Sequence, residues 1–163
     1  MASLGSRLFG KQIKNPLILA SGILGVTKAS LGSACENGAG AVTTKSLTWE
    51  PRRGHDGPNI IETECGLLNA MGYPNPGIDE GLREFSGWNR KDEALIISIV
   101  GKDAGEFGAL AGLIETKKKE LGASAIEAAI SCPHTPGYGT MAGQGTPESV
   151  TAITRAINEK TKL

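Results

Sequence analysis

The side chains best suited to chemistry in this sequence are a cysteine and a histidine two positions apart. Cys132 and His134 stand in the segment Ser-Cys-Pro-His that follows the apolar run 125–130. A thiol, with an ordinary pKa of about 8.5, becomes a usable base where its surroundings lower that value. His134 could tune this thiol or contact a ligand. The alternative for Cys132 is a small buried hydrophobe, the commonest environment of a free cysteine.

A lysine and a serine follow a second apolar run in the same way. Lys45-Ser46 comes directly after Ala-Val-Thr-Thr at positions 41–44. A fixed cation there would stabilise negative charge developing on an electron-rich cofactor. The alternative is a lysine that reaches water along its apolar stem.

Two further segments have compositions suited to a flat ligand. Ala20, Ser21 and Gly22 follow the run 16–19, and such small residues let a planar ring approach the backbone; the alternative is an ordinary turn. Residues 66–77 combine glycine, proline and asparagine, which is typical of turns. Their Leu-Leu-Asn-Ala-Met portion also suits a ligand wall, in which Asn69 could hydrogen-bond an amide ring.

The elements that must position these residues alternate along the chain. The apolar runs 16–19, 41–44, 95–100 and 125–130 predict strands, and helices are predicted from Thr27, Ile78, Asp103 and Thr146. The last helix should bury Val150, Ile153 and Ile157. Residues 6–13 predict a short hairpin, and residues 59–64 predict a small extra strand within a long polar loop.

The order strand–helix, repeated, predicts a parallel sheet covered by helices. Two architectures fit this order: an open doubly wound sheet, or four units of a barrel. Periodicity does not choose between them. In both architectures functional groups gather at the carboxyl ends of the strands, so the strand-end segments 20–22, 45–46, 100–102 and 131–134 should meet there.

Bulk properties exclude several classes of function. The 163 residues carry 17 basic and 17 acidic side chains, so we expect neither a nucleic-acid partner nor an anionic membrane. No apolar run approaches the roughly 18 residues of a membrane span. The three cysteines lack CxxC spacing, which favours a reducing cytoplasm, and no cluster with metal-ligand spacing, Walker loop or dinucleotide fingerprint is present.

Taken in order, the strand-end segments resemble class 1 dihydroorotate dehydrogenases, and most closely the NAD-linked subclass. The similarity covers nearly the whole chain. It rests on the joint order and spacing of four motifs: Asn-Pro-Leu-Ile-Leu-Ala-Ser-Gly at 15–22, Thr-Lys-Ser at 44–46, Gly-Leu-Leu-Asn-Ala-Met-Gly at 66–72 and Ile-Ser-Cys-Pro at 130–133. The resemblance implies a (β/α)₈ TIM-barrel fold, of which this chain holds about the first four βα units plus an N-terminal hairpin.

The resemblance also implies roles for individual residues. Cys132 matches the active-site base, which removes a proton from dihydroorotate while a hydride passes to FMN. The residues that match cofactor-binding positions are Ala20, Ser21, Gly22, Lys45 and Ser46. Those that match substrate-binding positions are Lys45, Asn69, Met71, Gly72, Tyr73 and His134.

Three positions depart from the family pattern. The family has asparagine where this chain has Ala129 and His134, and leucine where it has Tyr73. Ala129 cannot hydrogen-bond a ligand amide, and a lost buried hydrogen bond costs about 1–3 kcal/mol. A related flavoenzyme acting on another dihydropyrimidine-like substrate is therefore a competing hypothesis.

The length of the chain sets a second competing hypothesis. Residues 1–163 correspond to the N-terminal half of an FMN-binding barrel domain, and a complete (β/α)₈ barrel needs roughly 250 residues. The unpaired sheet edges of a half barrel favour a homo-oligomer or a complementing half barrel as partner. The chain could then be a catalytically incomplete remnant or an interaction module. The subclass implies an additional electron-transfer subunit with FAD and an iron–sulfur cluster.

Overall fold

The strand order of the central sheet decides between the two architectures. The computed structural model describes residues 4–22 and 24–163. Its parallel sheet has the order β3 (Ile18–Leu19), β4 (Ala41–Thr43), β7 (Ala94–Ile99) and β8 (Ala123–Ala128). A doubly wound sheet reverses its strand order at a switch point, whereas here each new parallel strand adds on the same side. The order therefore favours four successive units of a barrel.

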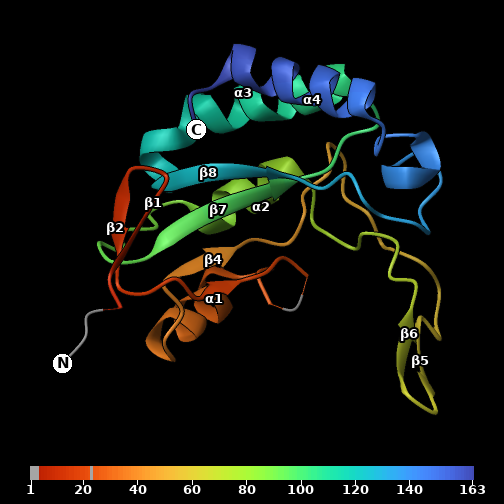
Figure 1. Ribbon diagram of the computed structural model, residues 1–163, viewed down its shortest axis with the longest axis horizontal. Coiled ribbons are helices and arrows are strands. Elements are labelled where there is room, and N and C mark those ends of the chain that lie inside the picture. The colour runs from red at the N-terminus through yellow and green to blue at the C-terminus, as the bar shows by residue number, and fades with distance from the viewer. Residues whose placement is uncertain (1–3, 23) are drawn as a thin grey trace.

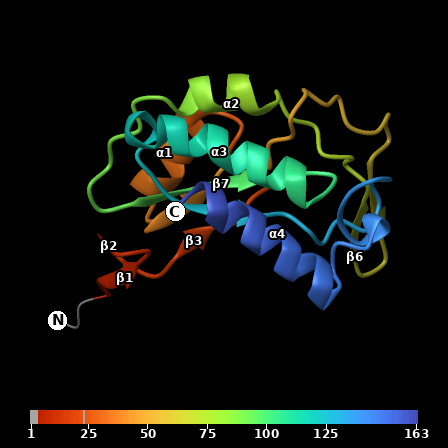
Figure 2. The ribbon, with the colours of Figure 1, turned by 90° about the horizontal axis from the view of Figure 1, so that it is seen from above.

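The helices cover one side of this sheet, as barrel units require. They are α1 (Lys28–Glu36), α2 (Ile78–Phe85), α3 (Ala104–Leu121) and α4 (Pro147–Lys160). In Figure 1, α1 lies below β4, and α3 and α4 lie above β8. Figure 2 shows α2 next to α3 in the same outer layer. Right-handed crossovers between neighbouring strands place successive helices on one face, so the opposite face becomes the barrel interior.

Three of the helices begin at side-chain caps, at the residues where the sequence predicts helix starts. Thr27 accepts a hydrogen bond from the Ser30 amide, and Asp103 accepts one from the Glu106 amide. Thr146 caps α4 in the same way and is followed by Pro147 at the first helical position. These local contacts fix where each helix starts, and hence the length of the loop between strand end and helix.

The core lies between the sheet and the helices. Leu95, Ile97 and Ile99 of β7 face the helix layer, while Ile96 and Ser98 alternate toward the barrel interior. The side chains that α1, α2, α3 and α4 contribute to this core include Leu31, Cys35, Leu82, Phe85, Phe107, Leu110, Ile114, Ile153 and Ile157. The predicted burial of Ile153 and Ile157 is thus confirmed, with one exception on the same helix.

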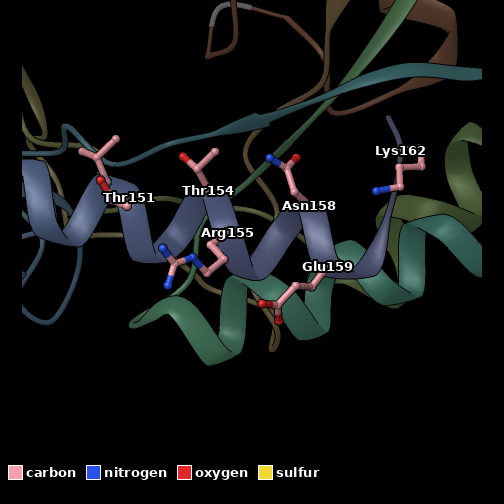
Figure 3. A pocket seen from close by; sticks show the side chains of 7 residues that line it. Thr151, Thr154, Arg155, Asn158, Glu159 and Lys162 are labelled. Carbon is pink, nitrogen blue, oxygen red and sulfur yellow. The ribbon is translucent and has the colours of Figure 1, made fainter.

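That exception is Val150, which we expected on the inner face and which is only partly buried. Val150 shares a helix face with Thr154 and Asn158, so it lies at the edge of the buried stripe. It lines a shallow hollow of about 640 Å³ on the outside of α4, whose polar walls Figure 3 shows. Residues 150–162 thus present polar side chains on the outer surface of the helix.

Two hairpins flank the sheet at its opposite ends. The predicted N-terminal hairpin pairs β1 (Ser6–Leu8) with β2 (Lys11–Ile13), and Ile13 is buried against the first residues of β4 and β7, Ala41 and Ala94. It therefore closes the amino-terminal end of the strands. The second hairpin pairs β5 (Ile60–Thr63) with β6 (Gly66–Asn69) and projects beyond their carboxyl ends (Figure 1).

The second hairpin was predicted only in part. The sequence indicates the extra strand at 59–64 but not its partner β6, which was expected to be loop. Every residue of both strands is exposed, so no alternation of buried and exposed positions marks them. The turn residues Glu64 and Cys65 also lack the Asn-Gly signal of a tight hairpin.

The sheet ends in open edges within the described residues. β3 pairs only with β4, and β8 pairs only with β7. Within residues 4–22 and 24–163, none of the helices combines the length and apolarity needed to cross a bilayer.

Candidate active site

The carboxyl ends of the strands and the base of the β5–β6 hairpin enclose one cleft of about 850 Å³. Its walls include ten of the eleven positions singled out from the sequence: Ala20, Ser21, Gly22, Lys45, Ser46, Asn69, Met71, Tyr73, Cys132 and His134. The other position, Gly72, is buried behind this wall. The strand-end segments 20–22, 45–46 and 131–134 therefore meet on one rim, as the parallel sheet requires, whereas residues 100–102 do not line this cleft.

The loop after β8 holds Cys132 through its backbone. The Cys132 carbonyl accepts hydrogen bonds from the Thr140 amide at 3.1 Å and the Thr140 hydroxyl at 3.2 Å. Gly139, with φ +56°, packs so closely that a Cβ atom there would lie 2.4 Å from the Cys132 carbonyl oxygen. Only glycine fits this approach, because a side chain would displace the cysteine backbone.

A buried glutamine anchors the same loop to the neighbouring strand end. The Gln144 side chain accepts from the Gly139 amide at 2.8 Å and donates to the carbonyls of Gly101 and Lys102 at 2.7 and 2.9 Å. Two of these three bonds cross from the loop after β8 to the loop after β7. These bonds hold the loop that carries Cys132 against the neighbouring strand end, so the position of Cys132 is fixed relative to the sheet.

The surroundings of Cys132 favour its thiolate. Burial alone raises the pKa of this thiol, but the Thr135 hydroxyl, the His134 and Thr135 amides and the Tyr73 hydroxyl hydrogen-bond it and together hold the pKa below its ordinary value. The Thr135 oxygen lies 3.1 Å from Sγ and is fully buried. The interpretation of Cys132 as an inert apolar filler is therefore disfavoured, since its sulfur has polar partners and faces the cleft.

Lys45 lies across the cleft on the end of β4. Its amide donates to the Gly25 carbonyl at 2.9 Å, and its side chain lines the cleft. Burial lowers the pKa of Lys45, with Cys132 acting in the opposite sense. The ammonium lies 5.8 Å from the centre of the Tyr73 ring, so the cation is held inside the cleft rather than in open water.

Tyr73 is held in an unusual backbone conformation. Its φ is +56°, a region that a bulky side chain rarely occupies. Its ring meets that of Tyr138 edge to face at 6.1 Å, and the Arg52 guanidinium lies 4.9 Å from the Tyr138 ring centre. Burial, and next the neighbouring Cys132, raise the pKa of Tyr73 far above its ordinary value, so its hydroxyl stays a donor.

His134 lies on the cleft wall and is tied to Gly72 through a second histidine. The His55 ring nitrogen Nε2 lies 2.9 Å from the His134 carbonyl oxygen. A Cβ on Gly72, which has φ +74°, would lie 2.7 Å from the His55 amide nitrogen. Gly72 thus supports the wall from behind. The role predicted for its backbone in holding substrate stays a prediction.

Asn69 and Met71 stand where the hairpin joins the cleft. Asn69 ends β6 opposite Ile60, and the Ala70 amide donates to the Asn59 carbonyl at 2.9 Å. The Asn69 side-chain amide has no hydrogen-bond partner among the residues that the structure describes, which leaves it able to bind a ligand. Ala129, which replaces the family asparagine, also lines the cleft.

Sequence reasoning missed two polar residues of the barrel interior. Ser98 of β7 is fully buried, and its hydroxyl donates to Glu127 of β8 at 2.7 Å. Glu127 lines the cleft as well. The available signal was a single polar residue in each of the apolar runs 95–100 and 125–130, and buried polar residues are usually hydrogen-bonded. In the described part of the chain no group of three or more acidic, histidine or cysteine side chains could hold a metal ion.

Comparison with known proteins decides the family. A protein-family model with the description "Dihydroorotate dehydrogenase" matches residues 3–163 of this chain. The chain belongs to the dihydroorotate dehydrogenase family. It is 44% identical over 164 residues to the dihydroorotate dehydrogenase B (NAD(+)) catalytic subunit of Methanocaldococcus jannaschii, and 44% identical over 159 residues to that of Pyrococcus furiosus.

These alignments cover 98% of this chain but only 52% and 51% of the two relatives, so the chain spans about half their length. A solved dihydroorotate dehydrogenase of Eimeria tenella, in complex with ferulenol, superposes with a TM-score of 0.71 at 20% identity. That match covers 96% of this chain and 43% of the other. It confirms the barrel-type α/β fold predicted from the resemblance, with this dihydroorotate dehydrogenase family chain forming part of the barrel.

Proposed function

We propose that residues 1–163 form the N-terminal half of an FMN-binding barrel that oxidises dihydroorotate to orotate in pyrimidine biosynthesis. The observation that carries this proposal is the convergence of Lys45, Asn69 and Cys132 on one cleft, with a thiol whose pKa is lowered. Membership of the dihydroorotate dehydrogenase family supports the reaction class.

The residues present fit the ring portion of FMN. Ala20, Ser21 and Gly22 offer a wall with little side-chain bulk, and a cleft of about 850 Å³ lies within the range of cofactor sites. The half-buried cation of Lys45 can balance charge on the ring. Bound FMN would supply the hydride acceptor. The groups that hold its phosphate are expected in the second half of the barrel, where barrel phosphate sites commonly lie.

The roles of the protein residues follow from their placement. Dihydroorotate would lose a proton from C5 to the Cys132 thiolate and a hydride from C6 to the cofactor, which leaves orotate. Asn69 and Lys45 would hold the substrate ring against the thiol, with Met71, Tyr73 and His134 closing the wall around it. Orienting the C5–H bond toward Sγ contributes much of the rate, because positioning makes the transfer effectively unimolecular.

The proposed partners follow from the open edges and from the named relatives. β3 and β8 each have one free side in the described residues, which a complementing half barrel or a second copy of the chain would cover. An FAD and iron–sulfur subunit would pass electrons from reduced FMN to NAD. All three cysteines are free thiols, which agrees with the cytoplasm as the proposed location.

Reconstitution tests the proposal directly. The chain would be co-expressed with a segment that completes the barrel, and FMN absorbance would be followed anaerobically after dihydroorotate is added. We expect bleaching in the wild type. We expect bound FMN but at least about a hundredfold slower bleaching in Cys132→Ala, because a proton acceptor contributes about 10²–10⁴ in rate. Unbleached FMN that is demonstrably bound to the completed wild-type barrel would contradict the proposal.

A second candidate substrate is favoured by one observation. Ala129 and His134 both line the cleft, so the two departures from the family pattern lie where a ligand would contact them. Another dihydropyrimidine-like ring would suit a wall with one amide fewer. If this is correct, Ala129→Asn raises orotate affinity in the completed barrel by about tenfold. Unchanged orotate affinity would rule out Ala129 as the cause of altered specificity.

A further inference from the structure

A histidine behind the cleft wall connects that wall to the loop that carries Cys132. His55 belongs to the loop between β4 and β5, and its amide donates to the Met71 carbonyl at 3.1 Å. Its ring packs against Gly72, where an added Cβ would lie 2.8 and 2.9 Å from the ring atoms Cδ2 and Cγ. These contacts hold the ring in place, and its Nε2 atom lies 2.9 Å from the His134 carbonyl oxygen.

The acceptor in this contact fixes its direction. A carbonyl oxygen only accepts hydrogen bonds, so the contact with the His134 carbonyl requires a proton on Nε2 of His55. Both the neutral ring with its proton on Nε2 and the imidazolium meet this requirement. His55 is therefore the donor, and the base-carrying loop supplies the acceptor.

The acceptor carbonyl shares a peptide unit with a donor to the thiol. The His134 C=O and the Thr135 N–H belong to one planar group, so they cannot turn independently of each other. The Thr135 amide is among the groups that hydrogen-bond Cys132 and lower its pKa. The Thr135 hydroxyl, 3.1 Å from Sγ, also places this residue beside the sulfur. A donor that holds the carbonyl end of the unit therefore also fixes the direction of its amide end.

The loop that carries Cys132 is thus held from two sides. Gln144 ties it to the loop after β7, and His55 ties it to the segment that follows β6. The two ties differ in burial, because Gln144 is buried whereas His55 is exposed. Water can therefore replace the His55 ring as a donor to the His134 carbonyl. Loss of His55 should leave the chain folded and change only how firmly the peptide unit is oriented.

We propose that His55 is a positioning residue for Cys132, whose Nε2–H group holds the peptide unit between residues 134 and 135 so that the Thr135 amide points at the sulfur. Hydrogen bonds in series strengthen one another, so the ring also makes this amide a better donor. Lys45 at the end of β4 and Tyr73 after β6 act on Cys132 as well, and both remain in every His55 variant. That the thiolate serves as a base rests on the proposed function, whereas the effect of His55 on the thiolate does not.

The pH dependence of Cys132 alkylation in the full chain, without cofactor, tests this role. The midpoint of the rate profile reports thiolate formation, and its plateau reports access of the reagent. We expect His55→Leu, which has no donor, to raise the midpoint by about 0.3–0.7 on the pH scale, equivalent to about two- to fivefold less thiolate below it. His55→Gln should restore the wild-type midpoint, because its amide nitrogen can donate to the same carbonyl.

Arg53→Leu is the matched control for these variants. It removes another exposed side chain of the same loop, one that pairs with Asp56, and should leave the midpoint unchanged. Equal midpoints for His55→Leu and Arg53→Leu would overturn the proposal. A midpoint that His55→Gln fails to restore would also overturn it, since the charge or bulk of the ring would then be responsible.

Two further measurements complete the test. Nitrogen-15 NMR of the imidazole should show His55 with its proton on Nε2 at a pH where the ring is neutral, and a proton on Nδ1 alone would overturn the proposal. In the completed barrel, bound FMN that dihydroorotate does not bleach would contradict the proposed function. The alkylation midpoints would still decide the role of His55, because they require neither cofactor nor substrate.

Discussion

The fully buried hydroxyl of Thr135 lies 3.1 Å from the sulfur of Cys132. The two residues are three positions apart in a loop that Gln144 and Gly139 hold against the sheet. Burial opposes the charged form of this thiol, and a hydrogen bond donated by the Thr135 hydroxyl favours it. The chemistry proposed for Cys132 therefore depends on a residue outside the motif that identifies the family.

Replacing Thr135 by valine tests this dependence. Thr135→Val keeps the side-chain shape but removes the hydrogen bond, so the pKa of Cys132 should rise. The alkylation rate of Cys132 increases with pH as the thiolate forms. In the variant this increase should occur at higher pH than in the wild type. At a fixed pH below that rise, its rate should fall about three- to tenfold, the value of one hydrogen bond. Mass spectrometry after iodoacetamide treatment measures the rate at each cysteine.

Cys35 provides an internal control in the same experiment. Burial raises the pKa of Cys35, so it should alkylate slowly in wild type and variant alike. Thr135→Ser keeps the hydroxyl and should restore the rate at Cys132. An alkylation profile of Cys132 that is the same in Thr135→Val and wild type would show that the hydroxyl does not act on the thiolate.

Tyr73→Phe removes the second side-chain donor to Cys132. Its ring contacts with Lys45 and Tyr138 remain, so the fold should be kept while the pKa of Cys132 rises. The same alkylation profile measures this shift. Tyr138→Phe is the matched control, because it removes a neighbouring buried phenol that is not among the causes of the Cys132 shift. Equal profiles for the two variants would argue against a direct role of Tyr73.

Gly139→Ala should disturb the position of Cys132 through the backbone. The added Cβ would lie 2.4 Å from the Cys132 carbonyl oxygen, in addition to the cost of φ +56°. Gly143→Ala is the control, since Gly143 has φ +69° but no atom within 4 Å of the added Cβ. We expect urea unfolding to give a loss for Gly139→Ala that exceeds the control by about 1–3 kcal/mol. Similar losses would mean that the close approach is not restrictive.

Gln144→Glu should break the connection between the loops after β7 and β8. A carboxylate can still accept from the Gly139 amide but cannot donate to the Gly101 and Lys102 carbonyls. Because the site is buried, we expect a loss of at least about 2 kcal/mol in the free energy of unfolding. Gln12→Glu makes the same change at an exposed position and should leave stability nearly unaltered. Equal stability of the two variants would contradict the anchoring role.

Local patterns predicted much of what the structure contains. The apolar runs predicted the strands, and Thr27, Asp103 and Thr146 announced three helix starts, because caps and burial patterns act within a few residues. The placement of Lys45 and Cys132 after their strands was also predictable, since parallel strands bring their carboxyl ends to one edge. The order and spacing of the motifs indicated the family.

Contacts between distant residues decided the rest. The strand order that favours a barrel, the partner of β5, the Tyr73 hydroxyl at the Cys132 thiol and the Ser98–Glu127 bond each join segments whose sequences carry no mark of one another. The prediction that Val150 is buried was wrong for the same reason, since the burial of this side chain depends on what packs against α4. The sequence by itself determined which residues stand at the strand ends. Only the tertiary structure decided which groups surround the Cys132 thiol and lower its pKa, because those hydrogen-bond partners are brought together by folding.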